Sequence, residues 1–425
     1  MTTREVHDET RRLLDLFAPG SAIEGEELVI GGCRVRELAE TFATPALIID
    51  ERALRQRARR YRDGLSARWA NSQVVWASKS LPCTAIYRIM GEEGLGVDVA
   101  GGGELVMALS AGVDPGRIVL HGNAKTDDEL QRAVRAEVGT IVIDNFDDID
   151  RLEKLVTNEQ AVLVRVVPNV DAPTHDAIAT GHANSKFGLS FDDAERAIAR
   201  LRASQRLRLD GLHVHVGSQI LSTEPFTRAI EAIARLGKFP VYDLGGGLGA
   251  RYTHEMTVPS VEQYLDALVA SAREHLPAES RILIEPGRSM VAESAMTLYS
   301  VVTVKRGAHR SFVAVDGGMG DNLEVSLYDQ AFDATVANRV GRGENFTLVG
   351  RHCESGDQLI ESVALRDPRI GDLIAVPVTG AYCMTMANNY NGALRPPIVM
   401  VRDATATLVQ RRETYDDLLR RDVTP

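Results

Sequence analysis

A lysine at the end of an apolar run is the first residue in this chain whose type and position could do chemistry. The run, residues 74–78, is rich in β-branched and aromatic residues, and Lys79 follows it directly. A strand of this composition is buried on both faces, so its terminal cation lies at the edge of a hydrophobic layer. A partly desolvated lysine amine has a lowered pKa and can form a Schiff base with a carbonyl compound. The alternative is a structural lysine whose ammonium group simply reaches water.

A glycine run and an arginine could hold an anion such as phosphate. Gly245, Gly246 and Gly247 are consecutive, and Arg288 follows later in the sequence Glu-Pro-Gly-Arg. Consecutive glycines expose backbone N–H groups and tolerate the φ values needed to wrap an anion. Arginine can add a bidentate contact. A tight turn would explain the glycines alone, but the two features together favour a phosphate site.

Two further residue types suit a flat, nitrogen-containing ring. Glu285 could pair with a protonated pyridine nitrogen, although an ion pair with Arg288 is the ordinary structural alternative. His213 and His215 share one face of a strand at a spacing of two, which is compatible with metal binding. No third ligand of suitable spacing accompanies them, so we predict no metal site and favour an imidazole packed on a cofactor ring.

These residues belong to a repeating pattern of short apolar runs separated by amphipathic helical stretches. Eight runs can be counted, the number of strands in a (β/α)8 barrel of the TIM type. Polar side chains that could take part in catalysis or binding lie at the carboxyl ends of the runs. In a barrel these ends form the face on which enzymes build their active sites. The runs cover residues 74–78, 96–99, 117–121, 140–144, 162–167, 211–216, 240–244 and 282–285. The residues at their ends are Lys79, Asp98, His121, Asn145, Asn169, His215, Gly245 to Gly247 and Glu285.

The helical alternation stops after about residue 291, which indicates a second, mostly antiparallel β domain. Its predicted strands are residues 301–304, 311–315, 345–348, 373–376, 398–401 and 406–409. Near the N-terminus we expect helices at residues 8–17 and 35–42, with a strand near Leu28 that belongs to the second β domain. The predicted organisation is an N-terminal segment, 1–47, packed with a C-terminal β domain, 292–425, and a (β/α)8 barrel over 48–291.

Composition excludes several classes of partner. A net charge of -11 without a basic stripe argues against nucleic acids and anionic membranes. Neither a signal peptide nor a run of about 18 apolar residues occurs, so a cytoplasmic location is expected. The cysteines are scattered without C-x-x-C spacing, which argues against a zinc ribbon or a disulfide scaffold; they are Cys33, Cys83, Cys353 and Cys383.

The chain resembles the diaminopimelate decarboxylase family of fold-type III pyridoxal-phosphate enzymes, a group that includes ornithine and arginine decarboxylases and, more distantly, alanine racemase. The resemblance covers nearly the whole chain, from the segment that begins at Thr44 to the one that begins at Arg412. The motifs that carry it are Ala77-Ser-Lys-Ser, Val97-Asp-Val-Ala, Gly103-Glu-Leu, His121-Gly-Asn-Ala-Lys, Pro168-Asn-Val-Asp, Lys186-Phe-Gly, His213-Val-His-Val-Gly-Ser-Gln-Ile, Gly245-Gly-Gly, Glu285-Pro-Gly-Arg, Asp316-Gly-Gly-Met, Cys353-Glu-Ser-Gly-Asp and Tyr390-Asn-Gly.

The resemblance implies pyridoxal 5'-phosphate as the cofactor, bound covalently by Lys79. It implies that His215 stacks on the ring, that Glu285 pairs with the ring nitrogen and that Cys353 is the proton donor. The implied cofactor contacts are Lys79, Asp98, Glu104, His215, Ser218, Gly245, Gly246, Gly247, Glu285, Gly287, Arg288 and Tyr390. The implied substrate contacts are Arg288, Glu324, Tyr328 and Glu354. In this family Cys353 and Glu354 would reach the active site from the other subunit of a homodimer.

One position departs from the family and bears on the substrate, an amino acid. The family usually has an arginine where this chain has Glu324, four residues before Tyr328, and that arginine contacts the distal carboxylate of diaminopimelate. An anion there replaces attraction by repulsion. We therefore favour an amino acid with a neutral or cationic far end. The alternative is an ordinary meso-diaminopimelate decarboxylase of lysine biosynthesis in which Arg351 or another cation substitutes.

Two other classes of protein are disfavoured. An amino-acid racemase needs an acid and a base on opposite faces of the substrate, commonly lysine and tyrosine, whereas the motif that begins at Cys353 indicates decarboxylation. A non-catalytic pyridoxal-phosphate binder or an antizyme-like regulator should have lost Lys79 or Cys353, and both are present.

Overall fold

The chain divides into two compact units. The barrel unit comprises Arg55–Gly249 and Thr257–Met290, and the β unit comprises Met1–Leu54, Ala250–Met256 and Val291–Pro425. The computed structural model describes residues 12–170, 181 and 185–423. The start of the helix predicted at 8–17, and Asp171 of one family motif, lie outside the described residues. Ala250–Met256, within the stretch predicted as barrel, belongs to the β unit.

The barrel unit confirms the predicted (β/α)8 architecture. Its eight strands are parallel, and hydrogen bonds between β12 and β5 close the sheet. The strands are β5 (Ser72–Ala77), β6 (Gly96–Val99), β7 (Ile118–Leu120), β8 (Thr140–Ile143), β9 (Gln160–Val166), β10 (Leu207–Val214), β11 (Val241–Asp243) and β12 (Arg281–Ile284). Nearly every strand residue except those at the amino ends is buried, because helices cover the outer face and side chains fill the interior.

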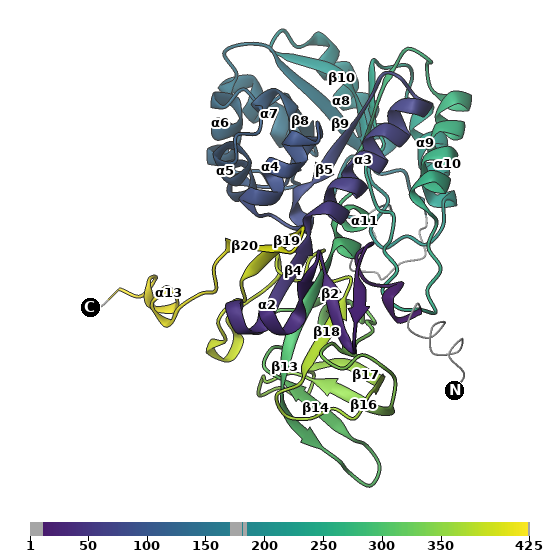
Figure 1. The fold of residues 1–425 in the computed structure, drawn as a ribbon. Coiled ribbons are helices and arrows are strands. Elements are labelled where there is room, and N and C mark those ends of the chain that lie inside the picture. Colours follow the sequence, from purple (N-terminus) through teal and green to yellow (C-terminus); the bar gives the residue numbers. More distant parts are fainter. Residues whose placement is uncertain (1–11, 171–180, 182–184, 424–425) are drawn as a thin grey trace. The chain divides into compact units, whose positions relative to one another are not determined.

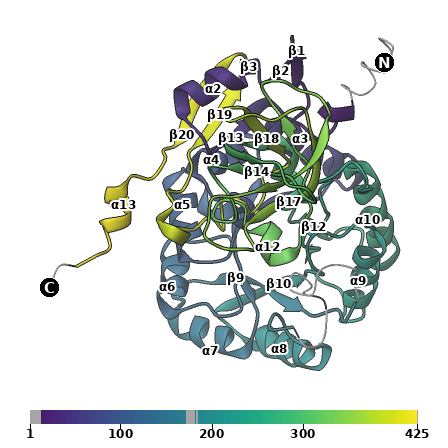
Figure 2. The same ribbon diagram turned by 90° about the horizontal axis from the view of Figure 1, so that it is seen from below.

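Helices surround the barrel strands (Figures 1 and 2). They are α3 (Glu51–Arg68), α4 (Thr84–Glu92), α5 (Gly102–Ser110), α6 (Asp127–Arg135), α7 (Phe146–Leu155), α8 (Phe191–Ala203), α9 (Glu224–Ala234) and α10 (Val261–His275). Several begin with a side-chain cap, such as Thr126 before α6 and Ser260 before α10, and each of these two caps forms a reciprocal capping box. Inside the barrel a layer of small branched side chains packs together: Val75, Val119, Val142, Leu163 and Leu283.

The β unit contains a nine-stranded, mostly antiparallel sheet, as predicted. The main path runs β17-β16-β14-β13-β4-β19-β20, and off this path β18 pairs with β13 and β15 pairs with β18. The strands are β4 (Ala46–Asp50), β13 (Ala295–Lys305), β14 (Phe312–Val315), β15 (Thr335–Val336), β16 (Glu344–Val349), β17 (Gln358–Leu365), β18 (Leu373–Pro377), β19 (Ile398–Arg402) and β20 (Thr405–Gln410). The short helices of this unit are α2 (Val35–Phe42), α12 (Glu324–Tyr328) and α13 (Tyr415–Leu419), whereas α11 (Arg288–Val291) lies at the end of the barrel unit.

The first N-terminal strands form a small sheet of their own within the β unit. The strand near Leu28, β2 (Glu27–Ile30), does not enter the nine-stranded sheet but pairs with β1 (Ala22–Glu24) and β3 (Cys33–Arg34). The N-terminal strand that does enter the sheet is β4, which pairs with both β13 and β19 and is buried along its whole length. Leu28 still packs in the same core as β4.

Candidate active site

Lys79 lies in a tight turn at the carboxyl end of the first barrel strand. The turn, η1 (Ser78–Ser80), directly follows β5. Ser80 Oγ donates to the Ala77 carbonyl at 2.8 Å, and Ser78 Oγ donates to Glu104 Oε2 at 3.3 Å. The same Glu104 oxygen accepts the Ala100 N–H at 2.7 Å, next to the start of α5. Glu104 therefore helps to position the turn that presents the half-buried Lys79.

Asp98 and His121 lie at the ends of β6 and β7, as predicted. Nε2 of His121 is 3.9 Å from Asp98 Oδ1 and 2.6 Å from Glu285 Oε1. Burial raises the pKa of Asp98 to about 6, with His121 acting in the opposite direction. Burial alone would lower the pKa of His121, but the charges of Glu285 and Asp98 outweigh it and raise that pKa. An imidazolium beside Glu285 is thus favoured.

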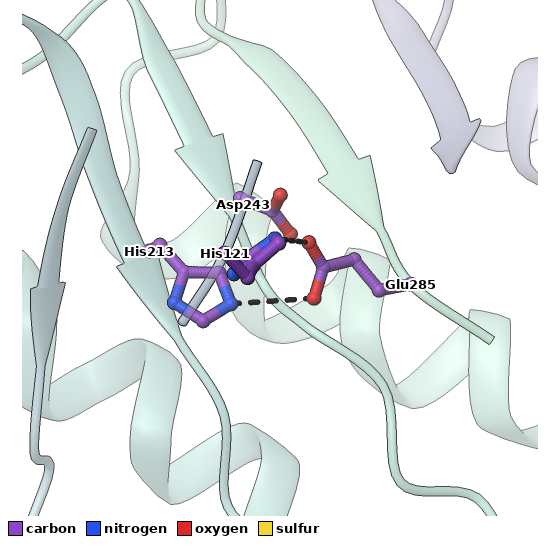
Figure 3. Close-up of side chains that lie close together, drawn as sticks. All are labelled: His121, His213, Asp243 and Glu285. Atoms are coloured by element: carbon purple, nitrogen blue, oxygen red, sulfur yellow. Dashed lines mark hydrogen bonds and ion pairs between the residues drawn. The ribbon is translucent and has the colours of Figure 1, made fainter. Parts of the chain in front are cut away.

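Glu285, just beyond β12, forms the centre of a fully buried polar cluster (Figure 3). His213 Nε2 lies 3.3 Å from Glu285 Oε2, so each carboxylate oxygen has an imidazole partner. Burial alone would raise the pKa of Glu285, but His121 and His213 outweigh it and hold that pKa well below its usual range. Glu285 makes its ion pairs with these histidines and not with Arg288, so the structural alternative proposed from the sequence is wrong.

His215 is a neutral imidazole with a defined tautomer. Its Nδ1 accepts the Gly246 N–H at 3.2 Å, so the ring proton is on Nε2. Burial lowers the pKa of His215 well below its usual range, and the positive charges of Lys79 and Arg165 act in the same direction. His213 and His215 do not act as a pair, because β10 ends at Val214 and the two rings have different partners.

The glycine run permits close packing of neighbouring strand ends. A Cβ on Gly246 would lie 2.0 Å from the Glu285 carbonyl oxygen, and Gly245 has a φ of +65°. The Gly245 N–H donates to Asp243 Oδ1 at 3.0 Å, and the Gly246 N–H is taken by His215. The expectation that these two N–H groups are exposed to an anion is therefore wrong.

Arg288 and Ser218 form the polar pair that could hold a phosphate. Arg288 Nε donates to Ser218 Oγ at 3.2 Å. The arginine is buried, with only 4% of its surface exposed. Gly287, directly before Arg288, packs closely on the end of β5, since a Cβ there would lie 3.1 Å from the Ala77 side chain. The two side chains provide a cation and a hydroxyl in one place.

Two residues of the barrel interior, Asp243 and Arg165, were missed by the sequence analysis as site residues, and His121 was named there only as a strand-end residue without a role. Arg165 is buried in β9, lies 3.7 Å from Asp144 and stacks over the Phe187 ring at 4.5 Å. A lone arginine inside an otherwise apolar run was the available signal, because such a cation is rarely buried without a function or a partner. Asp243 carried a similar signal at the end of β11.

Two other polar residues at strand ends have structural roles. Asn145 caps α7, accepting the Asp148 N–H on its side chain at 2.9 Å. Asn169 has a φ of +52°, a backbone conformation that asparagine tolerates better than most residues.

In the β unit, Glu324 is completely buried. It is the first residue of α12, and its Oε2 accepts a hydrogen bond from the Tyr252 hydroxyl at 3.4 Å. Tyr328, the last residue of the same helix, is half-buried. Arg351, the cation that could replace the family arginine, is exposed.

Cys353 and Glu354 lie on an exposed loop of the β unit whose backbone is held in place. Asp357 accepts the His352 N–H and the Met319 N–H, both at 2.7 Å, and so ties two loops together. The Cys353 N–H donates to Asn391 Oδ1 at 2.7 Å.

The neighbouring ring of Tyr390 completes this region. It is stacked on His352 with centroids 5.7 Å apart. The structure therefore brings the region of Cys353 and that of Tyr390 together within one unit.

Asp321 gives the β unit a predictable pH dependence. It is buried, and burial raises its pKa to about 7, whereas an unfolded aspartate titrates near about 4. Between these values the unfolded chain releases a proton that the folded chain keeps. The free energy of unfolding should therefore fall as the pH rises from about 4 to about 7, by up to about 4 kcal/mol from this group.

Urea unfolding of the wild type and of Asp321→Asn at pH 5 and pH 8 checks this expectation. The variant should lose most of that pH-dependent difference, whatever its absolute stability. Asp329→Asn, at an exposed position, is the control and should keep the wild-type difference. Equal pH dependence in Asp321→Asn and the wild type would contradict the assignment.

The barrel residues fit pyridoxal phosphate on chemical grounds. They comprise a half-buried amine, a buried carboxylate held as an anion, a buried neutral imidazole and an arginine beside a serine hydroxyl. A (β/α)8 barrel with these groups at the carboxyl ends of its strands defines a pyridoxal-phosphate enzyme of the barrel type.

Comparison with known proteins identifies the family. Residues 51–292 match the family described as "Pyridoxal-dependent decarboxylase, pyridoxal binding domain". The diaminopimelate decarboxylase of Actinosynnema pretiosum is 44% identical over 96% of this chain and 95% of its own. That of Bacillus subtilis is 39% identical over 96% and 98%. The chain belongs to the pyridoxal-dependent decarboxylases of the diaminopimelate decarboxylase type, and its cofactor is pyridoxal phosphate.

Solved structures agree with this assignment. The diaminopimelate decarboxylase of M. jannaschii, crystallised with L-lysine, superposes with a TM-score of 0.90 at 28% identity and covers 96% of this chain and 98% of its own. The lysine/ornithine decarboxylase of Vibrio vulnificus, at 23% identity and a TM-score of 0.76 over 86% of this chain and 97% of its own, shares the fold. No helix in the described part of the chain is long and apolar enough to cross a membrane.

Proposed function

We propose that this enzyme decarboxylates an amino acid whose far end is neutral or cationic, and that Glu324 sets this preference. Pyridoxal phosphate, when bound, supplies an electron sink for the carbanion that loss of carbon dioxide leaves at Cα. Lys79 binds the cofactor and yields to the substrate amine. Arg288 and Ser218 hold its phosphate, and Cys353 delivers the proton that replaces carbon dioxide.

The proposed contacts of the cofactor ring include two residues in different charge states. The anionic Glu285 faces the ring nitrogen and favours its protonated form. The neutral His215 packs on the ring without adding a positive charge beside Lys79. Asp98, Glu104, Gly247, Gly287 and Tyr390 complete the proposed cofactor contacts.

Glu324 is the observation that carries the substrate proposal. In the resembling family an arginine at this position contacts the distal carboxylate of diaminopimelate. Glu324 is fully buried, and as an anion it would repel a second carboxylate placed beside it. Tyr328 and Glu354 are the other proposed contacts of the substrate's far end.

The isosteric variant Glu324→Gln tests this role in the holoenzyme. Gln can still accept the Tyr252 hydrogen bond, so the variant removes charge with little change of shape. We expect kcat/KM for meso-diaminopimelate to rise about tenfold or more, since removal of a like charge recovers at least about 1.4 kcal/mol. Turnover of lysine or ornithine should not rise.

The matched control is Tyr252→Phe, which removes the hydrogen-bond donor but keeps the charge. It should leave the discrimination against meso-diaminopimelate in place. An unchanged kcat/KM for meso-diaminopimelate in Glu324→Gln would show that Glu324 does not set the specificity.

A second candidate is meso-diaminopimelate decarboxylation itself. The relatives named above carry that activity in their names. Arg351 is exposed, and among the described residues it makes no ion pair, so it remains a candidate for the missing arginine's task. Arg351→Ala would then raise the KM for meso-diaminopimelate selectively.

We further propose a cytoplasmic homodimer with shared active sites. Cys353 and Glu354 are exposed on the β unit, where a second subunit could use them. All four cysteines are free thiols, as expected in a reducing compartment. A sedimentation measurement on the purified enzyme gives the oligomeric state directly.

A further inference from the structure

Four buried side chains from four barrel strands converge behind the proposed cofactor contact. None of the four is more than 6% exposed; they are His121, His213, Asp243 and Glu285. Their nearest ligand-type atoms lie within 4.8 Å of one another. Figure 3 shows the carboxyl group of Asp243 beside that of Glu285, with both imidazoles hydrogen-bonded to Glu285.

One of the two carboxyl oxygens of Asp243 has no hydrogen-bond donor. Oδ1 accepts the Gly245 N–H at 3.0 Å. Oδ2 is buried without a hydrogen-bond partner in the structure. If Asp243 were ionised, a bare carboxylate oxygen would face a second carboxylate in a dry interior, which is strongly unfavourable.

Protonation of Asp243 resolves this conflict. A neutral carboxylic acid has an O–H donor, and the carboxylate of Glu285 is the acceptor beside it. Two carboxyl groups in contact commonly share one proton because both cannot ionise. The two imidazoles make Glu285 the group that ionises and leave Asp243 as the one that keeps the proton.

We propose that Asp243 is a positioning residue, held as a neutral acid whose Oδ2–H donates to Glu285. Glu285 then receives three donors, two from imidazoles and one from a carboxylic acid, and remains a single fixed anion directed at the cofactor's ring nitrogen. This inference rests on the proposed role of Glu285 but not on the identity of the amino-acid substrate.

The electrostatics of the cluster agree with this arrangement. Burial, followed by the neighbouring charge of Glu285, raises the pKa of Asp243 well above its usual range. Burial lowers the pKa of His213 to about 4, so this imidazole is neutral and donates through Nε2. Its Nδ1 atom is buried without a hydrogen-bond partner. His121 carries the positive charge that balances Glu285.

A metal site is the competing interpretation of two histidines and two carboxylates. Both Nε2 atoms point at Glu285 oxygens over hydrogen-bond distances, so their protons occupy the directions that metal-binding lone pairs would need. A stoichiometric amount of zinc or another divalent metal in the purified holoenzyme, retained after dialysis against a chelator, would overturn the proposal.

Asp243→Asn and Asp243→Ala form the decisive pair of variants. Asparagine can repeat both contacts, with Oδ1 accepting from Gly245 and Nδ2–H donating to Glu285. Asp243→Asn should therefore bind pyridoxal phosphate within about threefold of the wild type. Asp243→Ala loses both contacts and should bind the cofactor about tenfold or more weakly. Equal, severe loss in both variants would mean that Asp243 acts as a charge.

An infrared measurement on the unloaded wild-type protein tests the proton without any activity. At pH 8.5 the protein labelled with ¹³C-aspartate should show the C=O band of a buried carboxylic acid, because Asp98 and Asp321, with pKa values of about 6 and about 7, are then ionised. The band should be absent in Asp243→Asn. A wild type without the band would contradict the proposal even if the variants folded poorly.

Discussion

Replacing Lys79 by alanine should lower decarboxylation by at least about a thousandfold, the largest effect expected of any single substitution in this chain. The reason is that the variant loses the amine that holds the cofactor covalently and yields to the substrate. The protein should still fold, because hydrogen bonds of Ser78 to Glu104 and of Ser80 to the Ala77 carbonyl hold the turn around residue 79 in the variant as well.

Borohydride reduction followed by peptide mass spectrometry measures this prediction directly. In the wild type the cofactor mass should be found on the peptide that contains Lys79, and in Lys79→Ala it should be found on no peptide. Lys186→Ala is a suitable control, since Lys186 lies outside the proposed site residues. Cofactor attached to another lysine, or near-normal activity of Lys79→Ala, would refute the assignment.

Replacing Cys353 by alanine should lower kcat by about 100-fold to 10,000-fold, the range typical of removing a positioned proton donor. Cofactor binding should stay normal, because the barrel unit that holds Lys79 and Arg288 is unchanged. Cys33→Ala, at another free cysteine of the β unit, is the control and should keep full activity.

Mixed dimers test whether Cys353 acts across subunits. Lys79→Ala and Cys353→Ala are each expected to be inactive, but a heterodimer would contain one site with both residues. Random reassortment of equal amounts should then recover about a quarter of wild-type activity, since half of the dimers are mixed and each has one good site. No recovery, despite proven subunit exchange, would place Cys353 in the site of its own chain.

The barrel could be predicted from the sequence because its strands are local signals. Each strand is a short apolar run, and each run ends where a polar residue or glycine begins, so β6 was predicted at its observed bounds. The turn residue Lys79 and the strand-end residues Asp98 and Glu285 follow from the same pattern, because all carboxyl ends of parallel strands meet on one face.

The β unit was harder to predict because its pairing is non-local. β4 was not among the predicted strands, and its partners β13 and β19 lie about 250 and 350 residues away along the chain. β17 was missed altogether, since its buried and exposed positions do not alternate regularly. No short-range pattern identifies such partners.

The cluster around Glu285 could not be predicted for a related reason. Spacing alone made His213 and His215 a pair, but β10 ends between them and their rings bind different groups. The contact between Asp243 and Glu285 depends on the register of β11 against β12. Only the folded barrel reveals which carboxyl group lacks a donor.

The most direct test is carbon dioxide release by the purified, cofactor-loaded enzyme. It should be offered meso-diaminopimelate beside lysine, ornithine, arginine and glutamate, each in both enantiomers where they exist. We expect turnover of an amino acid with a neutral or cationic far end and little turnover of meso-diaminopimelate. Rapid turnover of meso-diaminopimelate alone would contradict the role given to Glu324, and release from none of them would contradict an amino-acid decarboxylase of this range.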